Sequence, residues 1–188
     1  MLLPDLLVPT YRQMLGTLSV WLAKAEGTLP EGGADALLRA RLAPDMFPLA
    51  TQVAFACRQA AEGMYRLKGE PFPAAIDTLL EDGREPEGRI DTIADAQARI
   101  TETLALVERI AGELGPVEDD AALPHALPIG LVFDFTAGQY ARDWALPQFF
   151  FHATIAYAIL RANGVPLGKA DYVGHLLPLV RPGTLPAQ

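Results

Sequence analysis

Cysteine and histidine are both scarce in this sequence, with one Cys and three His among 188 residues. The single thiol, Cys57, cannot form an internal disulfide, and the lack of a Cys-x-x-Cys pair excludes a thiolate metal cage. The chain starts with MLLPDLLVPTYRQ, which lacks the basic segment and the small-residue cleavage site of a secretory signal. Both observations favour a reducing compartment, and we expect a cytoplasmic protein.

Positive charge is the next deficit. The chain has 15 Lys and Arg against 23 Asp and Glu, for a net charge of -8 at pH 7. Proteins that bind nucleic acid need a basic surface to neutralise phosphates, so this charge excludes a nucleic-acid partner. The longest uncharged stretch, residues 144–160, is shorter than the roughly 20 apolar residues that a membrane span needs. Pro147 and His152 interrupt it, and we expect no membrane partner.

Motifs of well-defined enzyme chemistry are missing as well. The chain contains no G-x-S-x-G, P-loop, G-x-G-x-x-G or H-E-x-x-H. Cys57 lies in QVAFACRQAA at helical spacing from Val53, Ala60 and Met64. This spacing is typical of a small residue that faces a core, not of a nucleophile. No catalytic residue is indicated by a motif.

Apolar side chains with a helical period dominate what is present. Hydrophobic residues make up 51% of the chain and charged residues 20%, as in a compact globular protein, and we expect one domain over residues 1–188. Apolar positions recur every three or four residues in 11–27, 45–68, 92–114 and 136–163, which predicts four long helices. A short helical piece is expected near 35–42, and a long connection over 69–89.

Local signals mark where these helices begin. Asp45 is the expected N-cap of the second long helix, with Pro48 in its first turn. Thr92 and Asp95 have the spacing of a capping box at the start of the third helix.

Two runs suited to β-strands, 123–127 and 131–135, flank a Pro-Gly turn and predict a hairpin. Directly after it, Thr136 and Gln139 form a second capping pair that opens the fourth helix. Pro147 is expected to kink or break that helix. We therefore expect an all-α fold, a four-helix bundle with a small β-hairpin before the last long helix.

Three segments carry a resemblance to a known family: RLAPDMFPLATQV (41–53), FTAGQY (135–140) and ALPQFFFHATIAYAILRANGVPLGK (145–169). In this order they resemble a branch of the DinB/YfiT-like superfamily that has no established reaction. The resemblance implies a DinB-like four-helix bundle, often assembled as a dimer. Better-known members of the superfamily resemble metal-dependent thiol transferases and hydrolases, in which three histidines of the second and fourth helices hold a divalent metal.

The three histidines of this chain depart from that pattern. His125 falls in the predicted hairpin and His175 near the tail, both expected to be remote from the bundle axis. Only His152 stands where the resemblance places a ligand. One imidazole with scattered oxygens makes a poor zinc site. We expect no metal and no other cofactor, with a divalent metal as the less favoured alternative.

A candidate pocket can still be placed between the second and fourth helices, and its residues are His152, Gln52, Gln148, Asp45 and Asp143. Successive helical residues turn by about 100°, so His152 shares the inward face with Gln148, and Asp143 reaches that face only through a kink. His152 is a satisfied core histidine, a pocket wall or a metal ligand, in that order of preference. We expect it to be largely buried and hydrogen-bonded to a side chain of the second helix.

The opposite face of the fourth helix carries Phe150, Thr154, Tyr157 and Arg161, and it is too aromatic for a surface that meets only water. Either the connection 69–89 or a second subunit covers it, and we expect a homodimer. Two functions remain open. One is a small-molecule-binding or non-catalytic homodimer with a degenerate metal site. The alternative is a metal-dependent transferase or hydrolase acting on a small, thiol-type substrate.

Overall fold

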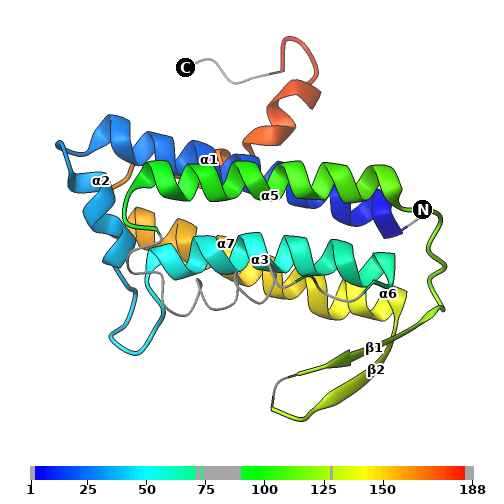
Figure 1. Ribbon diagram of the computed structural model, residues 1–188. Coiled ribbons are helices and arrows are strands. Elements are labelled where there is room, and N and C mark those ends of the chain that lie inside the picture. The colour runs from blue at the N-terminus through cyan, green and yellow to red at the C-terminus, as the bar shows by residue number, and fades with distance from the viewer. Residues whose placement is uncertain (1–2, 71–72, 74–89, 128, 185–188) are drawn as a thin grey trace.

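Four long helices form most of the computed structural model, which describes residues 3–70, 73, 90–127 and 129–184. They are α1 (Leu3–Thr28), α3 (Leu49–Lys68), α5 (Ile93–Glu113) and α7 (Leu146–Ala162). These helices lie side by side, and α1 and α3 each pack against the other long helices (Figure 1). Over the described ranges, none of the helices is both long and apolar enough to cross a membrane.

Helix α1 begins at Leu3, well before the predicted start at residue 11. Its fully buried side chains keep one helical stripe from end to end: Leu7, Tyr11, Leu15, Leu18 and Leu22. Pro9 is the seventh residue of the helix, so the helix lacks the backbone hydrogen bond that an N–H at this position would donate. The buried stripe therefore decides the length of the helix, and the proline does not end it.

Helix α3 begins at Leu49 with Pro48 as its N-cap, so the prediction that Asp45 caps it was wrong. A residue before proline is pushed out of the helical region, which prevents a helix from running through Phe47 into α3. Asp45 instead lies exposed in the turn before it. Nearly every residue of α3 is buried, which makes it the central helix.

The remaining helical starts follow the predicted signals. Thr92 and Asp95 form the expected capping box of α5. The short piece predicted over 35–42 is α2 (Gly33–Ala36) followed by the 3-10 turn η1 (Leu37–Arg39). Most of the predicted connection 69–89 lies outside the described residues.

The predicted hairpin is present. Its first strand lies one residue earlier than predicted and its second strand one residue later. Strands β1 (Ala122–Ala126) and β2 (Val132–Thr136) pair antiparallel, with His125 opposite Phe133. Gly130 has φ 85° in the turn between them, a conformation that glycine adopts without strain. The hairpin extends away from the long helices at one end of the molecule (Figure 1).

The last long helix is reached through a change of helix type. The Thr136–Gln139 capping box opens α6 (Ala137–Gln139), which continues into a π-helical segment, η2 (Tyr140–Ala145), and then into α7. Pro147 stands in the first turn of α7. Proline has no N–H to donate. The backbone before Pro147 is π-helical, and the chain continues through Pro147 as a helix.

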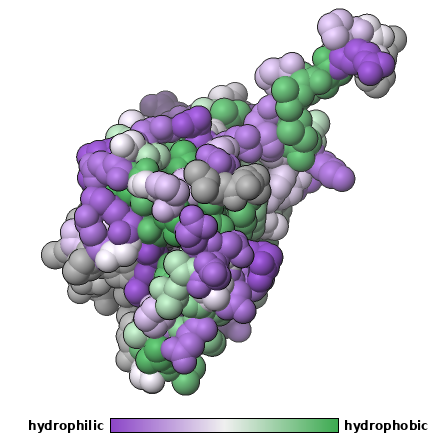
Figure 2. Space-filling view, turned by 90° about the vertical axis from the view of Figure 1, so that its right-hand side faces the viewer, coloured by the Kyte–Doolittle hydropathy of each residue, from purple (hydrophilic) through white to green (hydrophobic). Residues whose placement is uncertain are grey.

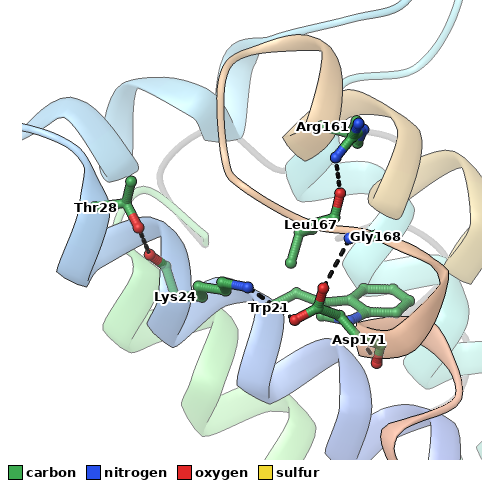
Figure 3. A network of polar contacts seen from close by, with 7 residues as sticks. All are labelled: Trp21, Lys24, Thr28, Arg161, Leu167, Gly168 and Asp171. Atoms are coloured by element: carbon green, nitrogen blue, oxygen red, sulfur yellow. Dashed lines mark hydrogen bonds and ion pairs between the residues drawn. The ribbon is translucent and has the colours of Figure 1, made fainter. Parts of the chain in front are cut away.

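The C-terminal segment packs against α1 and α7 at its start and extends from the long helices at its end (Figure 1). It contains α8 (Lys169–Tyr172) and η3 (Gly174–Leu179). Asp171 accepts hydrogen bonds from Lys24 Nζ at 2.8 Å and from the Gly168 N–H at 2.7 Å (Figure 3). Trp21 packs edge-on against Tyr157, with ring centroids 5.3 Å apart. Tyr172 of the C-terminal segment lies 5.8 Å from Tyr157, centroid to centroid, so this segment covers α7 at Tyr157 within one chain.

Candidate functional site

His152 and Gln52 meet between α3 and α7, as the helical faces predicted. Nδ1 of His152 is 2.9 Å from Gln52 Oε1, and Gln52 Nε2 donates to the carbonyl of Phe47 at 3.1 Å. Gln52 is buried and His152 is half-buried. The hydrogen bond expected from the second long helix to His152 is therefore confirmed.

Two aromatic rings lie next to the His152 imidazole. Phe55 lies 5.1 Å and Phe151 5.3 Å from it, centroid to centroid. Burial, and after it the positive charge of Arg58, lowers the pKa of His152 to about 4. The ring is neutral at neutral pH, so its contact with Gln52 is a hydrogen bond between uncharged groups.

The other residues of the candidate pocket are not all brought together. Gln148 lies one turn before His152 on α7 and is half-buried. Asp45 is exposed in the turn before α3. Asp143 is exposed on the π-helical segment and pairs with the neighbouring Arg142 at 2.9 Å. The two carboxylates therefore face solvent and do not join His152.

A resident metal does not fit the described side chains. Among the described residues, no three His, Cys, Asp or Glu side chains are grouped in a way that could hold a metal ion. His175 lies on η3 in the C-terminal segment. Cys57 is buried, and burial raises the pKa of its thiol to about 11, so it is not a ready thiolate ligand.

A second group of polar side chains lies at the hairpin end, and sequence reasoning missed it. We call its members the hairpin-end cluster: Tyr11 from α1, Glu62 from α3, His125 from β1, and Tyr140 and Trp144 from the π-helical segment. His125 was expected to be remote from the bundle axis, and this was wrong. Side chains alternate along a strand, and the inward side of β1 buries His125 to 2% exposure against α3.

The rings of the hairpin-end cluster are in contact. The His125 centroid lies 5.4 Å from that of Tyr140 and 4.8 Å from that of Trp144. Glu62 Oε1 is 3.9 Å from His125 Nδ1, which is too far for a hydrogen bond. The hydroxyl of Tyr11 lies directly over Gly63, where a side chain would otherwise be.

Several buried polar atoms of this cluster have no hydrogen-bond partner within the described part of the chain. They are the hydroxyls of Tyr11 and Tyr140, both ring nitrogens of His125 and Nε1 of Trp144. Buried polar groups are nearly always hydrogen-bonded, because an unsatisfied one costs about 1–3 kcal/mol. A concentration of such atoms, together with a π-helical segment, is a feature of functional sites.

The shifted pKa values of Tyr11, Tyr140 and His125 keep these side chains uncharged at neutral pH. Burial, and after it the negative charge of Glu62, raises the pKa of Tyr11 and of Tyr140, so both phenols keep their protons. Burial, followed by the positive charges of Arg66 and Arg58, lowers the pKa of His125 to about 4. The cluster therefore offers neutral donors beside one buried carboxylate, Glu62, which is paired with Arg58.

A cavity of about 530 Å³ lies between the C-terminal end of α3 and strand β1, and no residue of the hairpin-end cluster lines it. This volume lies within the range of about 300–1,000 Å³ that is typical of ligand sites. The walls combine small and apolar residues with a few charged ones, and they include Arg66, Leu67, Glu70, Val117, Ala122, Leu123 and Ala137.

Two sequence signals could have pointed to this site. Leu123 and His125 are two residues apart in a predicted strand, so both had to face the same side, and Leu123 belonged to the core. Glu62 stands in AFACRQAAEGMY, a run of mostly small and apolar residues where a carboxylate is unusual. Neither signal says that Tyr11, from the other end of the sequence, completes the group.

Comparisons with known proteins bear on the whole chain. A family model described as "Domain of unknown function (DUF1993)" matches residues 3–173. Among solved structures, the crystal structure of a DinB family member from Shewanella denitrificans is similar, with 32% sequence identity and a TM-score of 0.71. The match covers 98% of this chain and 96% of that chain. No curated protein matched. The predicted resemblance to DinB-like proteins without an established reaction is thereby confirmed.

Proposed function

The chain belongs to the DUF1993 family, and we propose that it is a small-molecule-binding, non-catalytic protein on a DinB-like four-helix bundle, with a degenerate metal site. The cavity of about 530 Å³ beside β1 carries this proposal. It is large enough for a small organic molecule, and its walls are mainly apolar with a few polar groups, as in most ligand sites.

The surroundings of His152 favour small-molecule binding over metal-dependent catalysis. Its Nδ1 is already engaged by Gln52, and the oxygens of Asp45 and Asp143 are on exposed positions. A catalytic zinc needs three protein ligands and one open position. His152 supplies one imidazole, which does not support the alternative of a metal-dependent transferase or hydrolase.

We further propose that the protein acts in the cytoplasm as a homodimer. Two segments that extend from the long helices expose apolar side chains: the hairpin turn, with Ile129 77% exposed, and η3, with Leu179 80% exposed. Figure 2 shows hydrophobic residues on both of these segments, at the bottom and at the upper right. Exposed apolar groups on extended segments are suited to contact with a second copy.

Binding of a small probe to the cavity tests the proposed function. Titration of ¹⁵N-labelled protein with ethylbenzene should shift backbone amide signals of β1 and of the C-terminal turn of α3. Ala122→Trp should abolish these shifts, because Ala122 lines the cavity and a larger side chain fills it. Ala126→Trp is the matched control, since Ala126 is exposed on the same strand and outside the cavity lining.

Two results would contradict the proposal. The first is equal shifts in Ala122→Trp and Ala126→Trp, which would place the probe elsewhere. The second is near-stoichiometric zinc or another divalent metal in protein purified without an affinity tag, measured by elemental analysis. That result would favour the metal-dependent enzyme.

A further inference from the structure

The elements that line the cavity also supply the hairpin-end cluster. On β1, Leu123 lines the cavity, and His125 follows on the same inward side of the strand. On α3, Arg66 lines the cavity, and Glu62 lies one helical turn earlier. The third lining element, α6, leads directly into Tyr140. No residue of the cluster lines the cavity itself, so the cluster lies behind the cavity wall, close in the chain to the residues that line it.

We infer that the hairpin-end cluster becomes the polar end of this cavity when the hairpin moves, and that it then binds the neutral carbonyl oxygen of a ketone, an ester or an amide. This inference rests on the proposed small-molecule function. The hydroxyls of Tyr140 and Tyr11 donate to that oxygen, and the apolar walls around Leu123 hold the hydrocarbon part of the ligand.

The unpartnered atoms of the cluster determine the preference for an acceptor. Nε1 of Trp144 can only donate a hydrogen bond, and the two phenols carry protons. Tyr11 and Tyr140 are fully buried, so bulk water does not satisfy their hydroxyls. A ligand oxygen with two lone pairs satisfies two such donors at once and gains the hydrogen bonds that the folded chain leaves unmade.

The buried surroundings of Glu62 determine the preference for a neutral ligand. Its carboxylate is almost fully buried and lies 3.9 Å from the His125 ring, at the centre of the cluster. Glu62 is already paired with Arg58, and burying a further charge in this poorly solvated space would cost the hydration of that charge. A carbonyl group places only a partial negative charge there.

Access to the cluster requires movement. The unpartnered polar atoms of the cluster have almost no surface open to solvent, so a ligand that reaches them displaces side chains between the cavity and the cluster. The hairpin that carries His125 extends from the helices (Figure 1), and it is the element whose displacement opens the cluster with the least disturbance of the long helices.

The matched probes acetophenone and ethylbenzene test the inference, because they differ by a carbonyl oxygen against a methylene group. Acetophenone should shift the indole N–H signal of Trp144. The indole N–H signal of Trp21 should stay unchanged, because this group donates a hydrogen bond to the Asp171 carbonyl at 3.3 Å. Tyr140→Phe should weaken acetophenone binding about tenfold, the effect of one lost hydrogen bond. The same variant should change ethylbenzene affinity less than about twofold.

Controls keep this test independent of folding. Tyr140→Phe removes a hydroxyl that has no partner within the described chain, so the variant should be at least as stable as the parent. Tyr157→Phe alters a ring on the far side of α7 and should leave both affinities unchanged. Equal acetophenone affinity in the parent, Tyr140→Phe and Tyr11→Phe would overturn the inference, as would tighter binding of benzoate than of acetophenone. Failure of both neutral probes to bind would overturn the proposed small-molecule site itself.

Discussion

At the scale of single residues, the packing of α1 on α3 at the hairpin end depends on a small residue that faces a large one. Gly63 lies in α3, and the Tyr11 hydroxyl occupies the space where a side chain at position 63 would be. The Tyr11 and Phe149 rings then meet edge to face, with centroids 4.9 Å apart. Glycine at position 63 lowers the helix propensity of α3. Because it has no side chain, α1 and α3 can approach each other at the hairpin-end cluster.

Gly63→Ala should therefore destabilise the protein by about 1–3 kcal/mol, the usual cost of overpacking a core. The new methyl group would overlap the Tyr11 hydroxyl and would lie 3.1 Å from Tyr11 Cζ. Urea denaturation followed by circular dichroism measures the change.

Gly112→Ala provides the matched control in another helix. A side chain at Gly112 would meet no atom within 4 Å, so alanine should stabilise α5 by roughly 0.5–1 kcal/mol through helix propensity. Tyr11→Phe combined with Gly63→Ala should recover part of the loss. An unchanged unfolding midpoint in Gly63→Ala would show that Tyr11 does not pack as described.

At the scale of elements, the C-terminal segment covers part of the aromatic face of α7. From the sequence, we expected the connection 69–89 or a second subunit to cover this face. Tyr172 of α8 lies 5.8 Å from Tyr157 and 5.4 Å from Trp21, centroid to centroid. Its hydroxyl is 3.1 Å from that of Thr154, and Arg161 donates to the Leu167 carbonyl. The aromatic face of α7 is therefore covered at Tyr157 by the same chain.

Asp171→Ala should release this segment. The variant loses the Lys24 ion pair and the acceptor of the Gly168 N–H, both drawn in Figure 3. We expect a loss of roughly 1–2 kcal/mol in unfolding free energy, typical of charged hydrogen bonds that are partly shielded from water. In a Trp144→Phe background, Trp21 emission should move to longer wavelength as Tyr172 withdraws.

Asp143→Ala serves as the comparison for this variant. Asp143 is exposed and pairs with its neighbour Arg142, and exposed pairs contribute little to stability. If Asp171→Ala left Trp21 emission and the unfolding midpoint as unchanged as Asp143→Ala does, the C-terminal segment would not be held by the described contacts.

At the scale of the whole molecule, the question is which surface meets a second copy. The prediction of a homodimer began from Phe150 and Tyr157 on α7. Tyr157 is covered within the chain, and Phe150 is half-buried and packs on Phe149 at 5.7 Å. The apolar side chains that stay most exposed lie on the hairpin turn and on η3, and they include Ile129 and Leu179.

We expect light scattering at micromolar concentration to return twice the chain mass of 20.3 kDa. The double variant Ile129→Asp, Leu179→Asp should return the mass of a single chain, because charged groups are costly in the centre of an interface. Tyr157→Ala should leave the dimer intact. A single-chain mass for the parent protein would refute the homodimer, and a dimer that resists the double variant would refute this choice of surface.

The helices and their caps were predictable because local physics determines them. The stripe of apolar residues in each helix, the Thr92–Asp95 and Thr136–Gln139 capping boxes and the strand alternation at the hairpin depend on neighbours in sequence. The contact between Gln52 and His152 was also within reach, because helical faces fix which side chains turn inward. Asp45 failed as a cap because Pro48, three residues later, constrains the backbone before it.

Tertiary structure decided which side chains from other elements contact the buried face of each helix or strand. Tyr11, Glu62, His125 and Tyr140 come from four separate elements, and no periodicity relates positions so far apart in the chain. The cover of Tyr157 by α8 depends in the same way on a distant segment that folds back. Residues near in sequence constrain one another through backbone geometry, whereas residues far apart meet only when the elements pack, and the candidate site was therefore determined by packing.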